Sequence, residues 1–457
     1  MKDHYGIRKA ELIRMNRGTR RAMRDTLSVF RAAVEYLGNV VLDHWDEISE
    51  AGSERAKKNV VETLVHKTGD NPSPLYRDFD RLFYKMPCYY RRSAIEFTIG
   101  QVQSYLTRLR KYNQEKYEAM SNGRRFGKKP PRLNLQTNAC PTLYKGNMFK
   151  VENGKVMIKL FVRNTWDWVV ADIPARDIKS LIKAEQRAWK THCPSLTFRY
   201  NKYYLVFPFE FRVSKFPEVA LCDQTVLGTD LGINNGAVCS VVDANGNVLH
   251  RRFDPFKEER ARIDAILWRI RRIQKQSGTG QSLSAVYTKL EGLKEDYVCR
   301  LSRWIVDLAI ETGVYGIVLE HLGKMKGRGS RKDRIHHWCK KNIASMVKGM
   351  AFREGIRVFF INPRNTSVLA FDGSGKVTRD PHNFSLCTFA SGKQYHCDLS
   401  ASYNIAARYF LRAMQNSMSS EAWARLVAKV PCAAKRTDCT LATLRSAACI
   451  DVSKEAA

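Results

Sequence analysis

Three acidic residues, far apart in the sequence, stand where their carboxylates could act together on a phosphodiester. Asp230 and Glu320 each end a short apolar stretch, residues 226–230 and 316–320, that is typical of a buried strand. Asp398 precedes an amphipathic stretch that predicts a helix. Carboxylate oxygens are the ligands that Mg²⁺ prefers, and bound divalent cations activate water for attack on phosphate. A single acid at a strand end is more often a turn or capping residue, so the hypothesis depends on all three together.

The charge of the chain indicates a polyanionic partner. The 457 residues include 77 Lys and Arg against 45 Asp and Glu, which gives a formal net charge of +32. Self-repulsion of that size opposes a compact fold unless an anion relieves it. Nucleic acid is the first candidate and an anionic membrane the second. No run of 18 apolar residues predicts a membrane span, and the charged N-terminus has no signal-peptide core, so we expect a cytoplasmic protein without a membrane partner.

The N-terminal third has helical periodicity and clusters of basic residues. Apolar residues recur at three- and four-residue spacing from residue 17 to about 117. A stretch rich in Gly, Pro and basic residues, 121–133, then breaks the helical pattern. Solvated helix faces are the alternative, but repeated basic clusters favour phosphate contact. The candidate contacts here are Arg17, Arg20, Arg21, Arg24, Arg124, Arg125, Lys128 and Lys129. A further basic group comprises Arg91, Arg92, Arg108, Arg110 and Lys111.

A small β-rich region follows. Strands are predicted at residues 155–162, 166–173, 196–200 and 203–209. Aromatic residues are dense in this region, and they can pack in a core or stack on nucleobases. The sequence does not separate these two roles.

The C-terminal half predicts an α/β domain of ribonuclease-H type. Three strands, with a hairpin turn at Asp243–Asn247, precede two long helices, a strand, a helix, a strand and a final helix. A polar loop at 323–334 supplies the further candidate contacts Arg328, Arg331 and Lys332. The 12 cysteines include no C-x-x-C pair, so we expect no disulfide scaffold. The adjacent His336 and His337 point apart on a helix, and a structural role is preferred to a metal site.

Motifs around the three acids resemble those of a known nuclease family. Residues 229–234 resemble the first RuvC motif of TnpB nucleases and of the compact type V CRISPR effectors, and residues 318–322 resemble the second. Residues 355–367 are similar to the segment that leads into the family's target-nucleic-acid-binding finger. The run from Asp398 to Ala407 resembles the third motif. The match covers about residues 222–411, while the N-terminal half matches only in its plan.

This resemblance implies an RNA-guided DNA endonuclease. The expected partners are a guide RNA and a double-stranded DNA target, with a monomer or homodimer on each guide. Asp230, Glu320 and Asp398 would ligate two Mg²⁺ ions and form the catalytic site. Transposon-encoded and CRISPR-associated members share this chemistry, and the sequence does not separate them.

The implied fold is a multidomain α+β protein. It comprises a helical recognition lobe, a small β-barrel-like wedge domain, and a ribonuclease-H-like (RuvC) α/β nuclease domain with an inserted finger. The expected boundaries are 1–16 for the wedge arm, 17–122 for the recognition domain, 123–221 for the wedge domain, 222–362 and 397–412 for the nuclease domain, 363–396 for a degenerate finger, and 413–457 for a C-terminal extension, helical or mobile.

The finger departs from the family pattern. Relatives usually carry two C-x-x-C pairs there, which is a zinc signal. The cysteines and histidines that remain here are Cys387, Cys397, His382 and His396. A Cys₂His₂ zinc site is the alternative, but we expect a metal-free finger stabilised by packing. The packing residues would be Phe371, Phe384, Leu386, Phe389 and Tyr395.

Two other functions remain open at this point. A guide-loaded repressor would bind DNA without cutting it, although loss of catalysis would be expected to remove a carboxylate. A transposase or resolvase of the same nuclease fold would need no RNA.

Overall fold

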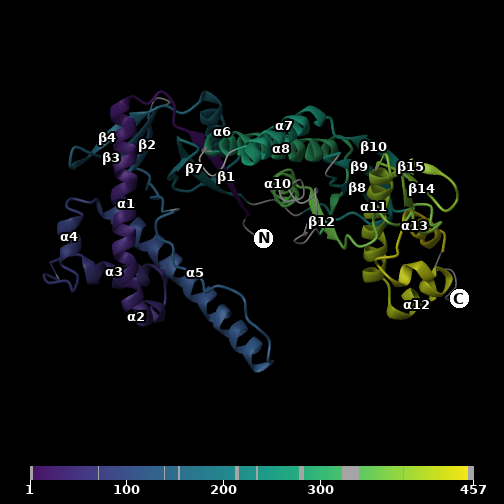
Figure 1. Cartoon of the computed structure of the whole chain (residues 1–457), viewed down its shortest axis with the longest axis horizontal. Helices are drawn as coiled ribbons and strands as arrows, with labels where there is room; N and C mark the ends of the chain where they lie inside the picture. Colours follow the sequence, from purple (N-terminus) through teal and green to yellow (C-terminus); the bar gives the residue numbers. More distant parts are fainter. Residues whose placement is uncertain are drawn as a thin grey trace. The chain divides into compact units, whose positions relative to one another are not determined.

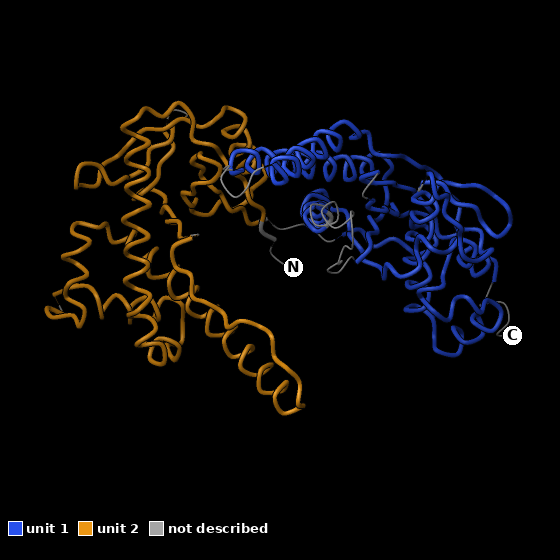
Figure 2. The backbone as a smooth tube through the Cα atoms, viewed as in Figure 1, with its two compact units in different colours: residues 1, 213–457 blue, residues 2–212 orange. Residues whose placement is uncertain are grey.

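The computed structural model describes residues 4–69, 71–137, 139–152, 155–211, 216–232, 235–276, 283–321, 339–383 and 385–450. The chain divides into two compact units, residues 2–212 and residues 213–457 together with Met1 (Figure 2). Each unit is described by itself. Among the described helices, none has both the length and the apolar character that a membrane span requires.

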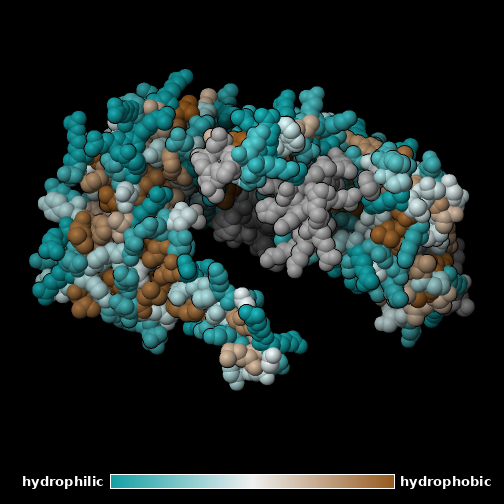
Figure 3. All heavy atoms as spheres, in the orientation of Figure 1, coloured by the Kyte–Doolittle hydropathy of each residue, from teal (hydrophilic) through white to brown (hydrophobic). Residues whose placement is uncertain are grey.

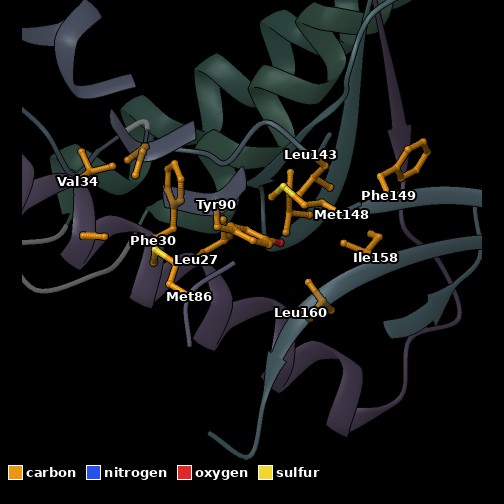
Figure 4. Close-up of a cluster of buried hydrophobic side chains, with 14 of the residues drawn as sticks. Leu27, Phe30, Val34, Met86, Tyr90, Leu143, Met148, Phe149, Ile158 and Leu160 are labelled. Atoms are coloured by element: carbon orange, nitrogen blue, oxygen red, sulfur yellow. The ribbon is translucent and has the colours of Figure 1, made fainter. Parts of the chain in front are cut away.

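Helices follow the first strand of the N-terminal unit (Figure 1). They are α1 (Arg17–Asp43), α2 (Trp45–Glu50), α3 (Glu54–Val65), α4 (Asp78–Leu82) and α5 (Cys88–Ser121). Helix α1 begins where the Asn16 side chain accepts a hydrogen bond from the Thr19 amide at 2.8 Å. Its buried stripe includes Leu27, Phe30 and Val34, which pack with Met86 and Tyr90 (Figure 4).

Two open sheets complete this unit. One contains β1 (His4–Glu11), β5 (Lys190–Thr191), β6 (Ser195–Arg199) and β7 (Lys202–Phe211), and the other contains β2 (Phe149–Glu152), β3 (Lys155–Val162) and β4 (Thr165–Ala171). The hydrogen bonds between these described strands do not close a barrel, so the barrel-like expectation is wrong. Helix α6 (Ala175–Gln186) was not predicted from the sequence.

A five-stranded sheet is the centre of the C-terminal unit. Its order is β10-β9-β8-β11-β12. The strands are β8 (Thr225–Asp230), β9 (Val238–Asp243), β10 (Val248–Phe253), β11 (Gly316–Glu320) and β12 (Arg357–Ile361). β10, β9 and β8 are antiparallel, whereas β8, β11 and β12 are parallel. The predicted turn between β9 and β10 is present, with the Asp243 carboxylate accepting from the amides of Asn245 and Asn247.

Helices cover both faces of this sheet. They are α7 (Lys257–Gln276), α8 (Ser284–Glu311), α10 (Lys340–Arg353), α11 (Cys397–Ser417), α12 (Ser420–Lys429) and α13 (Leu441–Ala448). Leu227 and Ile317 pack with α8 and α10, whereas Val226 and Val318 pack with α11. This alternation follows from the two-residue period of a strand. The C-terminal extension is helical in its described part, because α12 and α13 share the core of α11.

The finger forms a small three-stranded sheet. Its strands are β13 (Thr378–Arg379), β14 (Leu386–Thr388) and β15 (Gln394–His396). Phe371 lies against Phe389 and Tyr395, with ring centroids 5.5 and 5.0 Å apart. Leu386 is 36% exposed, so its predicted place in this packing is wrong. Phe384 lies outside the described residues.

Candidate active site at the sheet edge

Two of the three carboxylates end neighbouring parallel strands. Asp230 is the last residue of β8 and Glu320 the last residue of β11. Because Leu319 pairs with Thr229 in this parallel register, the two acids leave the sheet side by side at the same edge.

Helix α11 brings the third carboxylate to this edge. Asp398 lies in the first turn of α11, which begins at Cys397, so the helix includes Asp398 and does not start after it as the sequence predicted. Residues 398, 402 and 406 are four apart and so lie along one face of the helix. That face packs closely on β8, since a Cβ added at Gly228 would lie 2.3 Å from the Ser402 carbonyl oxygen and 2.9 Å from the Ala406 Cβ. Only glycine allows this approach, and it places Asp398 beyond the end of β8.

A second close approach locates the Asp398 carboxylate. A Cβ added at Gly232 would lie 3.5 Å from the Asp398 Oδ2. The Asn235 Nδ2 donates a hydrogen bond to the same oxygen at 2.8 Å. The segment that follows β8 therefore contacts the carboxylate that α11 presents.

Electrostatic coupling shows that the three acids share one environment. The pKa of Asp230 is raised well above its ordinary value, first by burial and then by the negative charges of Glu320 and Asp398. Arg379 in the finger acts in the opposite direction. A cation at this edge would relieve the mutual repulsion of the carboxylates.

The donor set suits a hard divalent cation, because its atoms are carboxylate oxygens. In the described part of the chain, no group of three or more His, Cys, Asp or Glu side chains is close enough, as it stands, to hold a metal ion. The role of the three carboxylates as ligands stays a prediction.

Three polar residues that support the acids were not singled out as functional from the sequence. The buried Thr366 donates its hydroxyl to the Glu320 Oε1 at 2.5 Å. The Asn404 Nδ2 donates to the backbone carbonyl of Thr366 at 3.1 Å. Asn235 binds Asp398, as described above. Asn235 and Asn404 stand beside or within a motif that contains an acid, and this proximity was the available signal, whereas Thr366 is distant in sequence from Glu320.

The predicted basic contacts have different surroundings. Arg17, Arg20, Arg21 and Arg24 on α1 are exposed, as are Arg124, Arg125, Lys128 and Lys129 after α5. Arg24 also pairs with Asp25, and Lys128 with Glu115. Arg328, Arg331, Lys332 and the pair His336 and His337 lie outside the described residues.

Arg91 is not part of an exposed basic face. It is only 6% exposed and donates to the Glu62 carboxylate at 2.9 Å. Its sequence neighbours alone could not show this pairing.

The possible zinc residues do not converge on one point. Cys387 and Cys397 are buried neighbours in the finger core. Burial first, and then a hydrogen bond between these two thiols, raise the pKa of Cys387 to about 12. The His396 Nε2 instead faces the Asn235 amide at 3.4 Å, beside Asp398.

Comparisons with known proteins found similar chains. A family model described as the Aq_aa04 family matches residues 7–162. The TnpB-like protein aq_aa05 of Aquifex aeolicus (strain VF5) is 29% identical over 114 residues, which cover 23% of this chain and 37% of that protein. The resemblance to TnpB is thereby confirmed. The chain spans little more than a third of the length of this curated TnpB relative.

Solved structures of compact CRISPR effectors also match along most of the chain. The Cas12f1–sgRNA–target DNA complex matches at 13% identity and a TM-score of 0.45, over 88% of this chain and 99% of that one. The mini RNA-guided endonuclease CRISPR-Cas_phi3 matches at 13% identity and a TM-score of 0.49, over 88% of this chain and 92% of that one. CasPhi-2 (Cas12j) bound to crRNA and phosphorothioate-DNA matches at 12% identity and a TM-score of 0.47, over 89% of this chain and 91% of that one. At this level of likeness, the side chains themselves have to support a function.

Proposed function

We propose that this protein is an RNA-guided DNA endonuclease. It binds a guide RNA, recognises a short motif beside the target, pairs the guide with one DNA strand and cleaves the DNA. The observation that carries this proposal is the placement of Asp230, Glu320 and Asp398 at one edge of the five-stranded sheet. The strand order and the α11 layer support a ribonuclease-H-like arrangement of this domain.

The three carboxylates would hold two magnesium ions in this proposal. Bound magnesium would supply Lewis-acid activation of water and stabilise the leaving oxygen. The chain's own contribution is to present the ligands. β8 and β11 present Asp230 and Glu320 side by side, and Thr366 and Asn235 restrict the orientations of Glu320 and Asp398.

The charge of the chain supports a nucleic-acid partner independently of the acids. The net charge of +32 already counts every acidic residue, the three carboxylates included, so all of it is surplus positive charge. Guide and target strands together provide the phosphates that such a surplus can neutralise, so RNA binding should weaken steeply as salt rises.

The test starts from the protein as purified. The RNA that co-purifies is sequenced, and cleavage of a matching duplex is measured with Mg²⁺ and with EDTA. Variants Asp230→Asn, Glu320→Gln and Asp398→Asn should each abolish cleavage and leave RNA binding intact. The control Glu311→Gln removes an exposed acid on α8 and should cleave normally.

Three outcomes would contradict the proposal. If the purified protein contained no RNA, the proposal that it uses a guide RNA would be wrong. Full cleavage after ribonuclease treatment would favour a resolvase or transposase. Tight guide-directed DNA binding with no cleavage in any divalent metal would favour a repressor.

A further inference from the structure

A cavity in the N-terminal unit lies outside the acidic site. Its volume is about 520 Å³, which falls within the range of about 300–1,000 Å³ that small-molecule sites occupy. Helix α1, the segment between α4 and α5, and the β3–β4 hairpin form its walls. The lining residues are Ser28, Val29, Ala32, Leu82, Phe83, Tyr84, Met86, Phe161, Asn164 and Trp166.

Four of the ten lining residues are aromatic, and none of the ten carries a charged side chain. Tyr84 is 67% exposed and Leu82 58% exposed, so large apolar surfaces stand open to solvent at this site. Figure 3 shows hydrophobic side chains on the visible face of this unit, among hydrophilic ones. Aromatic walls suit a flat, unsaturated ligand, because its ring can stack on theirs. Such stacking tolerates different nucleobases, since every base has a π-face.

One wall residue has an unused hydrogen-bond donor. The Trp166 indole nitrogen is buried and has no hydrogen-bond partner within the described residues. Such a group is costly to bury alone. The Tyr90 ring packs against the Trp166 ring, with ring centroids 4.5 Å apart. Because this nitrogen is buried, the part of Trp166 that lines the cavity is its ring carbon surface, which suits stacking.

Basic residues adjoin the lining residues in sequence. Lys85 lies between Tyr84 and Met86, Arg81 precedes Leu82, and Arg163 precedes Asn164 in the hairpin turn; all three are exposed. Phosphate groups would be attracted to this surrounding charge.

We propose that this cavity holds one unpaired nucleobase of a bound polynucleotide, stacked on its aromatic walls. This site depends on the proposed function only in taking nucleic acid as the partner. It makes no use of the carboxylates and is independent of cleavage.

The test compares the affinity of the protein for two nucleic acids of equal charge, one with an unpaired base and one that lacks this base. Two otherwise identical fluorescein-labelled duplexes carry either one bulged adenosine or one abasic residue, and each pair is made in RNA and in DNA. Binding to the full-length protein, stripped of bound RNA at high salt, is measured by anisotropy. Because stacking of one base contributes about 5- to 100-fold in affinity, the wild type should prefer the adenosine by that factor in at least one nucleic acid.

Variants assign the preference to the cavity. Tyr84→Ala removes a wall and Ala32→Leu fills space, and both change exposed positions, so the fold should be kept. Each should reduce the preference to below about twofold. Tyr117→Ala, which removes a 73% exposed aromatic residue outside the cavity, should keep it.

The outcomes separate this proposal from the first one. Equal wild-type affinity for the adenosine and abasic duplexes in both RNA and DNA would overturn it, as would an undiminished preference in Tyr84→Ala and Ala32→Leu. If only the RNA duplexes or only the DNA duplexes show the preference, that nucleic acid supplies the base that the cavity binds. Guide-directed cleavage is assayed separately, so its failure would leave the base preference measurable.

Discussion

Replacing Arg408 with methionine should release the C-terminal extension from helix α11. Arg408 is 4% exposed, and each of its hydrogen bonds within the described residues goes to a backbone carbonyl. Its acceptors are the carbonyl oxygens of Cys439 at 3.1 Å, Asn362 at 3.0 Å, Arg364 at 2.7 Å and Thr437 at 2.7 Å. One side chain thus connects α11 to the segment after β12 and to the segment before α13.

The magnitude follows from these contacts. A hydrogen bond from a charged donor contributes about 1.5–3 kcal/mol, so four would sum to about 6–12 kcal/mol if they were independent. They share one guanidinium, and its burial has a cost of its own, which is visible as a lowered pKa of Arg408. Methionine also fills much of the same volume. We therefore expect local destabilisation of about 3–5 kcal/mol.

Hydrogen exchange measures this locally, without requiring the two units of the chain to unfold together. The useful amides are those of Leu441, which donates to the Asn404 Oδ1, and of Ala442, which donates to the Phe371 carbonyl. At about tenfold per 1.4 kcal/mol, exchange there should accelerate by about 140- to 4,000-fold.

The matched control is Arg412→Met, one turn further along α11. Arg412 is exposed, with a 3.4 Å contact to the Phe360 carbonyl, and exchange should change less than threefold on its removal. If Arg408→Met gave the same small change, the carbonyl contacts would not be what holds the extension.

Three further predictions concern the site and the finger. Thr366→Val keeps the shape but removes the hydroxyl that binds Glu320, so single-turnover cleavage should slow by about 10- to 100-fold with RNA binding unchanged; an unchanged rate would refute the positioning role. Gly228→Val should destabilise the protein by about 1–3 kcal/mol or more, because its side chain would meet the Ser402 carbonyl, whereas Gly349→Ala, in open space, should not; equal melting temperatures would contradict this account. Elemental analysis should find no stoichiometric zinc, and about one zinc per chain would refute the metal-free finger.

The sequence predicted best where periodicity and turn chemistry agree. The strands that end at Asp230 and Glu320 are present, as is the hairpin turn after Asp243, because each has an apolar run or a turn signal of its own. Helix α6 and the buried state of Arg91 were missed. The helix lies within a β-rich region, and the arginine is buried by a long-range partner, Glu62, that no local pattern reveals.

The acids were found by motif, but their supporting residues depend on tertiary contacts. Thr366 and Glu320 are 46 residues apart in the chain, and Asn235 and Asp398 are 163 apart. Nothing in the spacing of such pairs distinguishes a supporting side chain from an ordinary polar loop residue. The pairing of β12 with β11 brings Thr366 beside Glu320, and the packing of α11 on β8, through Gly228, brings Asp398 to the segment that holds Asn235.

The two faces of α11 connect the carboxylate site to the rest of the C-terminal unit. Along one face, Ser402 and Ala406 contact β8 in line with Asp398. Along another, four residues apart, Ser400, Asn404 and Arg408 bind backbone groups of the segments that flank the finger and the C-terminal extension. A helix held on both faces has little freedom to shift, so loosening the second face should also displace the Asp398 carboxylate. For that reason Arg408→Met should slow cleavage, although Arg408 contacts none of the three acids through a described hydrogen bond. The Arg408→Lys variant should cleave faster than Arg408→Met but more slowly than the wild type, since lysine cannot reach four carbonyls in a fixed fork.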